Sequence, residues 1–133
     1  MRGKHIVLMV GLWLGWGTLS FADKTANLQR LLQTKSCVKC ELVGVVLSGK
    51  DLLGVDLYKA NLQGSEIIKC NLTESYLVGV NFLGANLEGS NFYKSKLEDT
   101  IFIKAKLTGA KFEAVNLMGA NFQEASLEGR LDH

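Results

Sequence analysis

The chain has three cysteines, and two of them, Cys37 and Cys40, form a C-x-x-C motif. This spacing occurs in thioredoxin-like redox pairs and in local disulfides, and it supplies two of the four ligands in many zinc sites. A thioredoxin-like motif follows a strand and opens a helix, whereas here a helical pattern precedes the motif and a β pattern follows it. A zinc site needs two further ligands, and the only histidine beyond residue 22 is His133, at the far end of the sequence. The motif therefore does not indicate a catalytic redox centre or a zinc centre.

Other catalytic and cofactor-binding patterns are missing from the sequence. It shows no Ser/His/Asp set, no glycine-rich loop between a strand and a helix, and no cluster of metal-ligating residues. We therefore expect no enzymatic activity, no metal and no cofactor.

The feature that organises the chain is a period of five residues. From Leu42 to Leu127 every fifth residue is Leu, Ile or Phe, and the residue two positions earlier is small everywhere except at Lys50. Side chains two residues apart in extended backbone point the same way, so the large and the small residue both face inward. A period of five fits neither a helix nor a flat strand. It predicts a chain that turns a corner every five residues.

The fives ANLQG, VNFLG, ANLEG and ANFQE resemble the pattern of the pentapeptide-repeat family. The resemblance implies an all-β fold, a right-handed quadrilateral parallel β-helix with four pentapeptides in each coil. Residues 40–129 would then form a solenoid of about 4.5 coils.

In this register, residues one coil apart stack, so two phenylalanine ladders are expected to meet across the axis. One ladder would contain Phe82, Phe102 and Phe122, and the other Phe92 and Phe112. The fifth position is a corner, which accounts for the recurring glycines. Residues expected to bond the turn backbone through their side chains are Asp51, Asp56, Asn61, Asn71, Asn81, Asn86, Asn91, Asn116 and Asn121.

Residues 1–22 have the order of a secretory signal peptide. A positively charged start precedes an apolar run that ends at Phe21, and small residues at positions −3 and −1 place a cleavage site before Asp23. The run is shorter than the ~20 residues that span a bilayer, and an uncleaved anchor is the alternative. We therefore expect an exported protein that has no membrane contact after cleavage.

Residues 23–39 are predicted to form a capping helix and its junction with the solenoid. Asp23 or Thr25 would cap this helix. Its apolar stripe, which would cover the first coil, consists of Leu28, Leu31 and Leu32. The segment LQRLLQTKSCVKCEL resembles the N-terminal segment of exported cyanobacterial pentapeptide-repeat proteins, which implies the periplasm or the thylakoid lumen. A helix that binds a partner is the alternative.

The cysteines are expected to have two different fates. In an oxidising compartment, Cys37 and Cys40 would form a disulfide that staples the helix to the first coil. Cys70 takes a small inward position, stacked between Lys50 and Ser90, and lies more than one coil from Cys40 on another side. That separation is beyond the reach of a disulfide, so Cys70 is expected to be a buried free thiol.

Any binding function is expected on the outward positions, where apolar clusters mark interfaces. The candidate interaction residues are Val43, Leu83, Ile101 and Ile103 on one side, and Tyr58, Tyr76 and Val78 on another. We expect a non-enzymatic structural or protein-interaction module with an unknown protein partner. The alternative that the family implies is a DNA-mimicking protein that binds gyrase. Such mimicry requires strong negative charge, whereas residues 23–133 contain 13 basic and 13 acidic residues and so have zero net charge. This zero charge and the predicted export signal argue against a nucleic-acid role.

The end of the repeat suggests how the chain associates. The period stops after Leu127, and residues 130–133 form a short tail. The last coil would leave its ladder edge and apolar core poorly covered, and such edges pair readily. We expect a homodimer in which two C-terminal coils meet about a two-fold axis. The alternative is that Leu131 folds back over the end.

Overall fold

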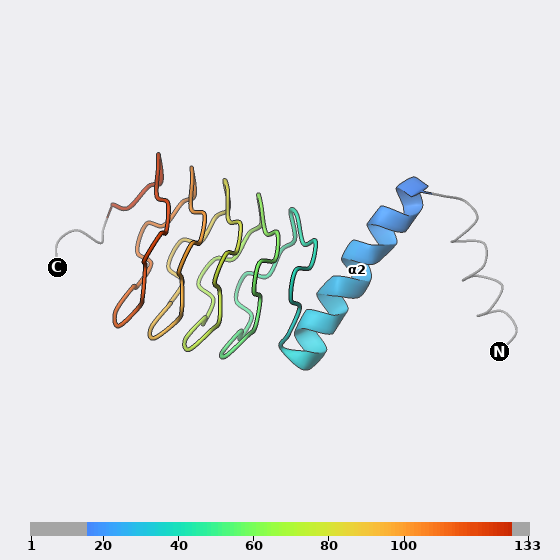
Figure 1. Cartoon of the computed structure of the whole chain (residues 1–133), viewed down its shortest axis with the longest axis horizontal. Helices are drawn as coiled ribbons and strands as arrows, with labels where there is room; N and C mark the ends of the chain where they lie inside the picture. Colours follow the sequence, from blue (N-terminus) through green and yellow to red (C-terminus); the bar gives the residue numbers. More distant parts are fainter. Residues whose placement is uncertain (1–15, 129–133) are drawn as a thin grey trace, which may run out of the picture.

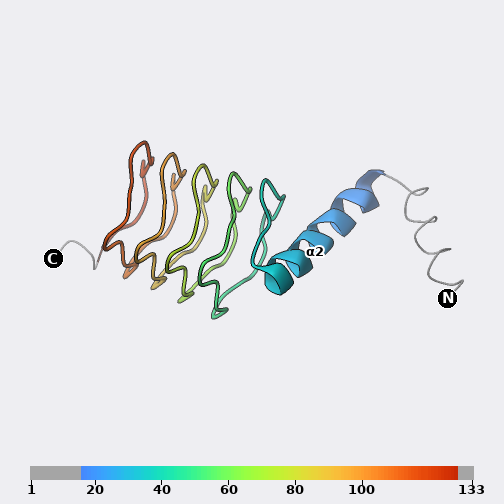
Figure 2. The same cartoon turned by 60° about the horizontal axis from the view of Figure 1, so that its bottom comes forward.

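The computed structural model describes the backbone of residues 16–128 and the side chains of residues 23–128. In this part of the chain a single helix, α2 (Trp16–Thr34), leads into a tower of stacked coils (Figure 1). The C-terminal part of α2 meets the first coil, and its N-terminal part points away from the tower (Figure 2). Residues 1–15 of the predicted signal peptide and the predicted tail 130–133 lie outside the described residues.

The helix is longer than the sequence predicts. It begins at Trp16, inside the predicted signal peptide, so Asp23 and Thr25 lie within it and neither is its N-cap. The reason is that the apolar run is itself compatible with a helix and contains no proline to end it. The helix stops where Lys35 takes a left-handed φ of 62° and its N–H donates to Leu31 O at 2.8 Å. This is a left-handed C-terminal cap.

The tower is held together by parallel β-bridges between residues 20 positions apart. The series runs from Ser36–Asp56 to Lys106–Ser126. Four bridges start in each stretch of 20 residues, so four pentapeptides make one coil. The predicted register is therefore confirmed.

The ladder begins one pentapeptide earlier than predicted, at Ser36 and not at Cys40. Cys37 occupies the inward position that Leu, Ile or Phe takes in later fives, and its N–H donates to Asp56 O at 2.9 Å. A cysteine at this position breaks the apolar pattern in the sequence but behaves as a small apolar residue in the structure.

Each pentapeptide turns a corner of the tower. In the second five, Val45 N–H donates to Leu42 O at 3.3 Å, and Gly44 between them has a φ of 74°. A positive φ at the third residue is typical of a type II turn and favours glycine. The corner role predicted for the recurring glycines is therefore confirmed, although Lys104 also takes this conformation with a φ of 59°.

The turn role predicted for the Asn and Asp residues is also confirmed. Asn81 Oδ1 accepts the N–H of Leu83 at 2.9 Å, and Asp51 Oδ1 accepts the N–H of Leu53 at 3.2 Å. The same bond is made by Asp56, Asn61, Asn71, Asn86, Asn91, Asn116 and Asn121. These side chains fix the entry to each corner.

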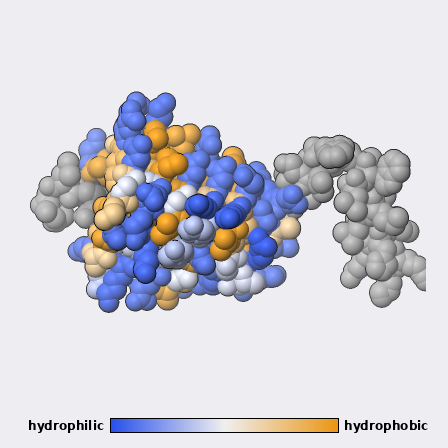
Figure 3. Space-filling model, in the orientation of Figure 1, coloured by the Kyte–Doolittle hydropathy of each residue, from blue (hydrophilic) through white to orange (hydrophobic). Residues whose placement is uncertain are grey.

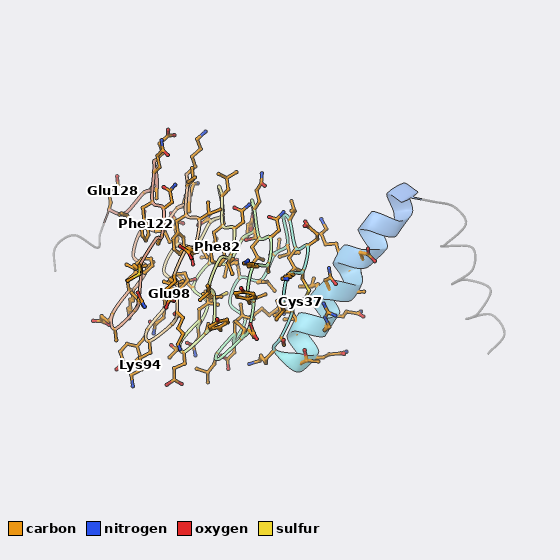
Figure 4. All side chains as sticks on the ribbon, viewed as in Figure 1. Cys37, Phe82, Lys94, Glu98, Phe122 and Glu128 are labelled. Carbon is orange, nitrogen blue, oxygen red and sulfur yellow. A yellow bond between two sulfur atoms is a disulfide. The ribbon has the colours of Figure 1, made fainter. Side chains whose placement is uncertain are left out.

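The two predicted phenylalanine ladders fill the axis of the later coils. Phe102 stacks on Phe82 and Phe122 with centroid distances of 5.4 and 4.9 Å, and Phe92 stacks on Phe112 at 5.0 Å. Across the axis the rings meet edge to face, with 6.0 Å between Phe92 and Phe102. Figure 4 shows Phe82 well inside the tower and Phe122 nearer its C-terminal end. The core is therefore an aromatic column with alternating ring orientation.

The inward residues are buried along most of the tower and become partly exposed at its C-terminal end. Inward residues are buried from Leu42 to Ala110, with the exception of Lys50, whose side chain is exposed. Lys50 belongs to the first coil, and no coil precedes it, so its long side chain can leave past the open edge. At the other end, the inward residues Phe122 and Leu127 are only half-buried.

The C-terminal half of α2 covers part of the first coil. Leu31 is fully buried and Leu28 packs against the same core, as predicted. The prediction is wrong for Leu32, which is 40% exposed and lies outside the buried stripe. Lys24 Nζ donates to Val43 O at 3.0 Å, and Asn27 Nδ2 donates to Glu41 O at 3.2 Å. The helix thus supplies side-chain donors to carbonyl groups that have no preceding coil to bond.

Candidate functional site

Cys37 and Cys40 form the predicted disulfide, with their Cα atoms 5.4 Å apart. Both side chains point inward and are 1% and 4% exposed. The prediction that this bond staples the helix to the coil is wrong, because both cysteines belong to the coil that begins at Ser36, whereas α2 ends at Thr34. The disulfide closes a corner of the first coil, beside the C-terminal end of α2 (Figure 4).

Two α2 residues contact the sulfur atoms, and sequence reasoning missed both. Arg30 Nη2 lies 2.7 Å from Cys40 Sγ and 3.6 Å from Cys37 Sγ. The carbonyl oxygen of Asn27 lies 3.4 Å from Cys37 Sγ. Asn27 and Arg30 are three residues apart and so share one helix face. Their proximity to Leu31, which faces the core, was the signal that could have identified this face.

Cys70 is a free, buried thiol, as predicted. Its Sγ donates to Leu47 O at 2.9 Å, and its N–H donates to Ser90 Oγ at 3.0 Å. Burial raises the pKa of the Cys70 thiol above its usual value. The thiol therefore stays neutral and acts as a small core residue.

The candidate interaction residues lie on two sides of the tower. Val43 and Tyr76 are 39% and 40% exposed. The remaining candidates are half-buried: Leu83, Ile101, Ile103, Tyr58 and Val78. The rings of Tyr58 and Tyr76 stack with their centroids 5.7 Å apart. Figure 3 shows apolar side chains between polar ones on one face of the tower.

We call the side that carries both tyrosines the tyrosine side; it is formed by residues 36–39, 56–59, 76–79, 96–99 and 116–119. Sequence reasoning missed two of its exposed apolar residues, Val38 at 42% and Met118 at 75%. Both stand in the same stacked column as Tyr58 and Val78. Comparing residues 20 apart along that column could have identified them.

One charged group borders this apolar column, and another stands within it. Lys59 Nζ lies 5.4 Å from the centroid of the Tyr58 ring, within the range of a cation–π contact. Glu98 stands between Val78 and Met118, and its Oε2 accepts Asn116 Nδ2 at 2.8 Å. The other oxygen, Glu98 Oε1, is buried and has no partner among the described residues. The tyrosine side can therefore offer aromatic and aliphatic contacts next to both signs of charge.

No group of three or more His, Cys, Asp or Glu residues in the described part of the chain is placed to hold a metal ion. No helix within residues 16–128 is long and apolar enough to cross a membrane.

The bridges and the inward alternation define a parallel β-solenoid built from pentapeptides. The Pentapeptide repeats family model matches this chain with 8 copies, over residues 36–73, 66–102 and 102–129. The chain therefore belongs to the pentapeptide-repeat family. No curated protein matches the sequence.

The solved structures that are similar to this chain include a cyanobacterial protein and a fluoroquinolone resistance protein. The pentapeptide repeat protein Rfr23 from the cyanobacterium Cyanothece 51142 has a TM-score of 0.52 and 25% identity, over 78% of this chain and 99% of that one. A trypsin-treated variant of QnrB1, a plasmid-mediated fluoroquinolone resistance protein, has a TM-score of 0.60 and 22% identity, over 66% of this chain. The match covers only 45% of QnrB1, and this likeness shows the fold alone.

Proposed function

We propose that the protein is a non-enzymatic protein-interaction module that works after export, in the periplasm or the thylakoid lumen. Its tower is inferred to be the right-handed β-helix that the family resemblance implies. The observation that carries the proposal is the tyrosine side, where an outward apolar column stands on a closely packed, regular core. Such a scaffold presents side chains without having to order them on binding.

The stacked pair Tyr58 and Tyr76 would anchor the partner. Tyrosine supplies a large contact area with few rotatable bonds and is enriched at interfaces. Val38 extends the apolar column at one end, Met118 adds an apolar side chain beyond Glu98 at the other, and Lys59 borders the column. The partner would therefore be a protein whose contact surface has an apolar centre and a carboxylate that meets Lys59.

Replacing both tyrosines with serine is expected to reduce recovery of the partner at least tenfold when the tagged protein is purified from its native compartment. The matched control is Tyr93→Ser, because Tyr93 is 39% exposed but lies on another side of the tower. Circular dichroism should show all variants folded, since the three rings lie on the surface. Equal recovery with the double variant and the control would contradict a role for the tyrosine side.

The proposal of export rests on the order of residues 1–22 and on the disulfide, which persists in oxidising compartments. Cleavage before Asp23 would keep every α2 contact described above, because Lys24, Asn27, Arg30 and Leu31 all follow that site. N-terminal sequencing of the isolated protein is expected to start at Asp23. A chain recovered from the cytosol and starting at Met1 would contradict export. It would also renew the alternative of a gyrase-binding DNA mimic, which the net charge of +2 disfavours.

We also propose that two copies associate through their C-terminal coils. The half-buried residues Phe112, Leu117, Phe122 and Leu127 form an incompletely covered end of the core. Leu127→Lys would place a charge in that contact, so light scattering should give a dimer for the wild type and a monomer for the variant. A wild-type monomer at tens of micromolar would favour the folding back of Leu131, which lies outside the described residues.

A further inference from the structure

The two sulfur atoms of the disulfide have chemically different neighbours, and both neighbours come from α2. The guanidinium of Arg30 lies 2.7 Å from Cys40 Sγ, and the carbonyl oxygen of Asn27 lies 3.4 Å from Cys37 Sγ. A cation beside a sulfur favours its thiolate. A carbonyl oxygen beside a sulfur can accept an S–H and does not favour a negative charge.

Neither contact reaches its full strength while the disulfide is intact. A disulfide sulfur carries no hydrogen to donate and is only a weak acceptor. After reduction, the Cys37 thiol could donate to Asn27 O, and a Cys40 thiolate could accept a charge-assisted hydrogen bond from Arg30. Reduction therefore adds interactions between α2 and the first coil.

We infer that Cys37 and Cys40 form a reversible dithiol–disulfide couple whose reduced form is stabilised by Arg30, and that its reaction partners are dithiols. The reduction potential of a dithiol–disulfide pair rises when its reduced form is stabilised. Arg30 therefore acts as a positioning residue that makes this pair easier to reduce than a disulfide without such a contact.

The neighbours of the two sulfur atoms also determine which cysteine is attacked and which one leaves in thiol–disulfide exchange. A thiolate of the reducing dithiol attacks Cys37 Sγ, the bond between the two cysteine sulfurs breaks, and Cys40 Sγ leaves with the electron pair as a thiolate beside Arg30. The second thiolate of the reductant then attacks the reductant sulfur of the mixed disulfide. Cys37 leaves and takes up a proton, and the reductant ends as a disulfide. A stabilised leaving thiolate makes the first step faster.

Burial decides which reductants can reach the bond. Cys37 and Cys40 are 1% and 4% exposed, so a protein dithiol has access only when α2 lifts from the first coil. A small dithiol such as dithiothreitol is therefore the appropriate probe. The reduced pair should hold α2 in place, because the contacts with Asn27 and Arg30 then become stronger.

The first test is the equilibrium of the full chain with reduced and oxidised dithiothreitol. After quenching and alkylation under denaturing conditions, the oxidised protein carries one alkylated cysteine, Cys70, and the reduced protein carries three. Arg30→Met is expected to shift the equilibrium about tenfold toward the disulfide, or about 30 mV. Lys24→Met is the matched control, because it removes an α2 anchor that contacts Val43 O and no sulfur. Equal shifts in the two variants, or no shift in Arg30→Met, would overturn the inference.

The second test separates this role from a general loss of stability. Arg30→Lys keeps the positive charge and should restore the equilibrium to within about threefold of the wild type. Hydrogen exchange should show the amides of residues 24–34 at least as protected in the reduced wild type as in the oxidised wild type, but less protected in reduced Arg30→Met. A reduced wild type that loses this protection as fully as the variant would also overturn the inference.

Discussion

Phe102→Ala is expected to lower the free energy of unfolding by about 4 kcal/mol. Phe102 is fully buried, stacks on Phe82 and Phe122, and meets Phe92 and Phe112 edge to face at 6.0 Å. Its removal leaves a cavity that the neighbouring rings cannot close, because the backbone ladder fixes the spacing of the coils. Urea unfolding followed by circular dichroism measures the loss.

Phe122→Ala is the matched control, since it removes the same side chain from the end of the ladder. Phe122 is only half-buried and has a stacking partner, Phe102, on one side. The expected loss is about 2 kcal/mol or less, because solvent already reaches the site and the last coil can relax. Equal losses at the two positions would contradict the difference in burial between the middle and the end of the tower.

Ser90→Lys is expected to cost more than about 4 kcal/mol or to prevent folding. Ser90 is fully buried, its Oγ donates to Ile67 O at 2.6 Å, and the same oxygen accepts the N–H of Cys70 at 3.0 Å. A lysine here would lose these bonds and carry an ammonium group into a core covered by coils on both sides. Soluble yield and thermal unfolding report the effect.

Lys50 provides the natural comparison, because it stands in the same column two coils earlier and its side chain is exposed. Lys50→Ser should change the free energy of unfolding by about 0.5 kcal/mol or less, as at other surface sites. The same residue type is thus tolerated at the open edge and excluded from the interior. A folded, stable Ser90→Lys would show that the middle of the tower admits a charge as easily as its edge.

The sequence by itself determined the repeat and what each of its five positions does. Large residues such as Phe102 and small ones such as Ser90 face inward, and Asn81 and its counterparts bond the corner backbone. The register of four pentapeptides per coil followed from the family resemblance. These features were predictable because each position has the same surroundings in every coil. The same short pattern therefore recurs many times and indicates the same structure each time. The Cys37–Cys40 pairing was accessible for a related reason, since the two residues are three apart and their bond needs no distant contact.

The tertiary structure decided the features at the start of the repeat, where the first coil contacts α2 or solvent and not another coil. The rotation of α2 about its own axis buries Leu31, exposes Leu32 and brings Arg30 to the sulfur atoms. A five-residue period holds no information on that rotation, because the helix has a period of 3.6 and its fit depends on one unrepeated interface. The first coil has a neighbouring coil on one side only, so the side chain of Lys50 reaches solvent. In the same coil, Cys37 occupies a position that holds Leu, Ile or Phe in later coils. Exposure at such an edge depends on which neighbour is missing, and only the assembled structure specifies that.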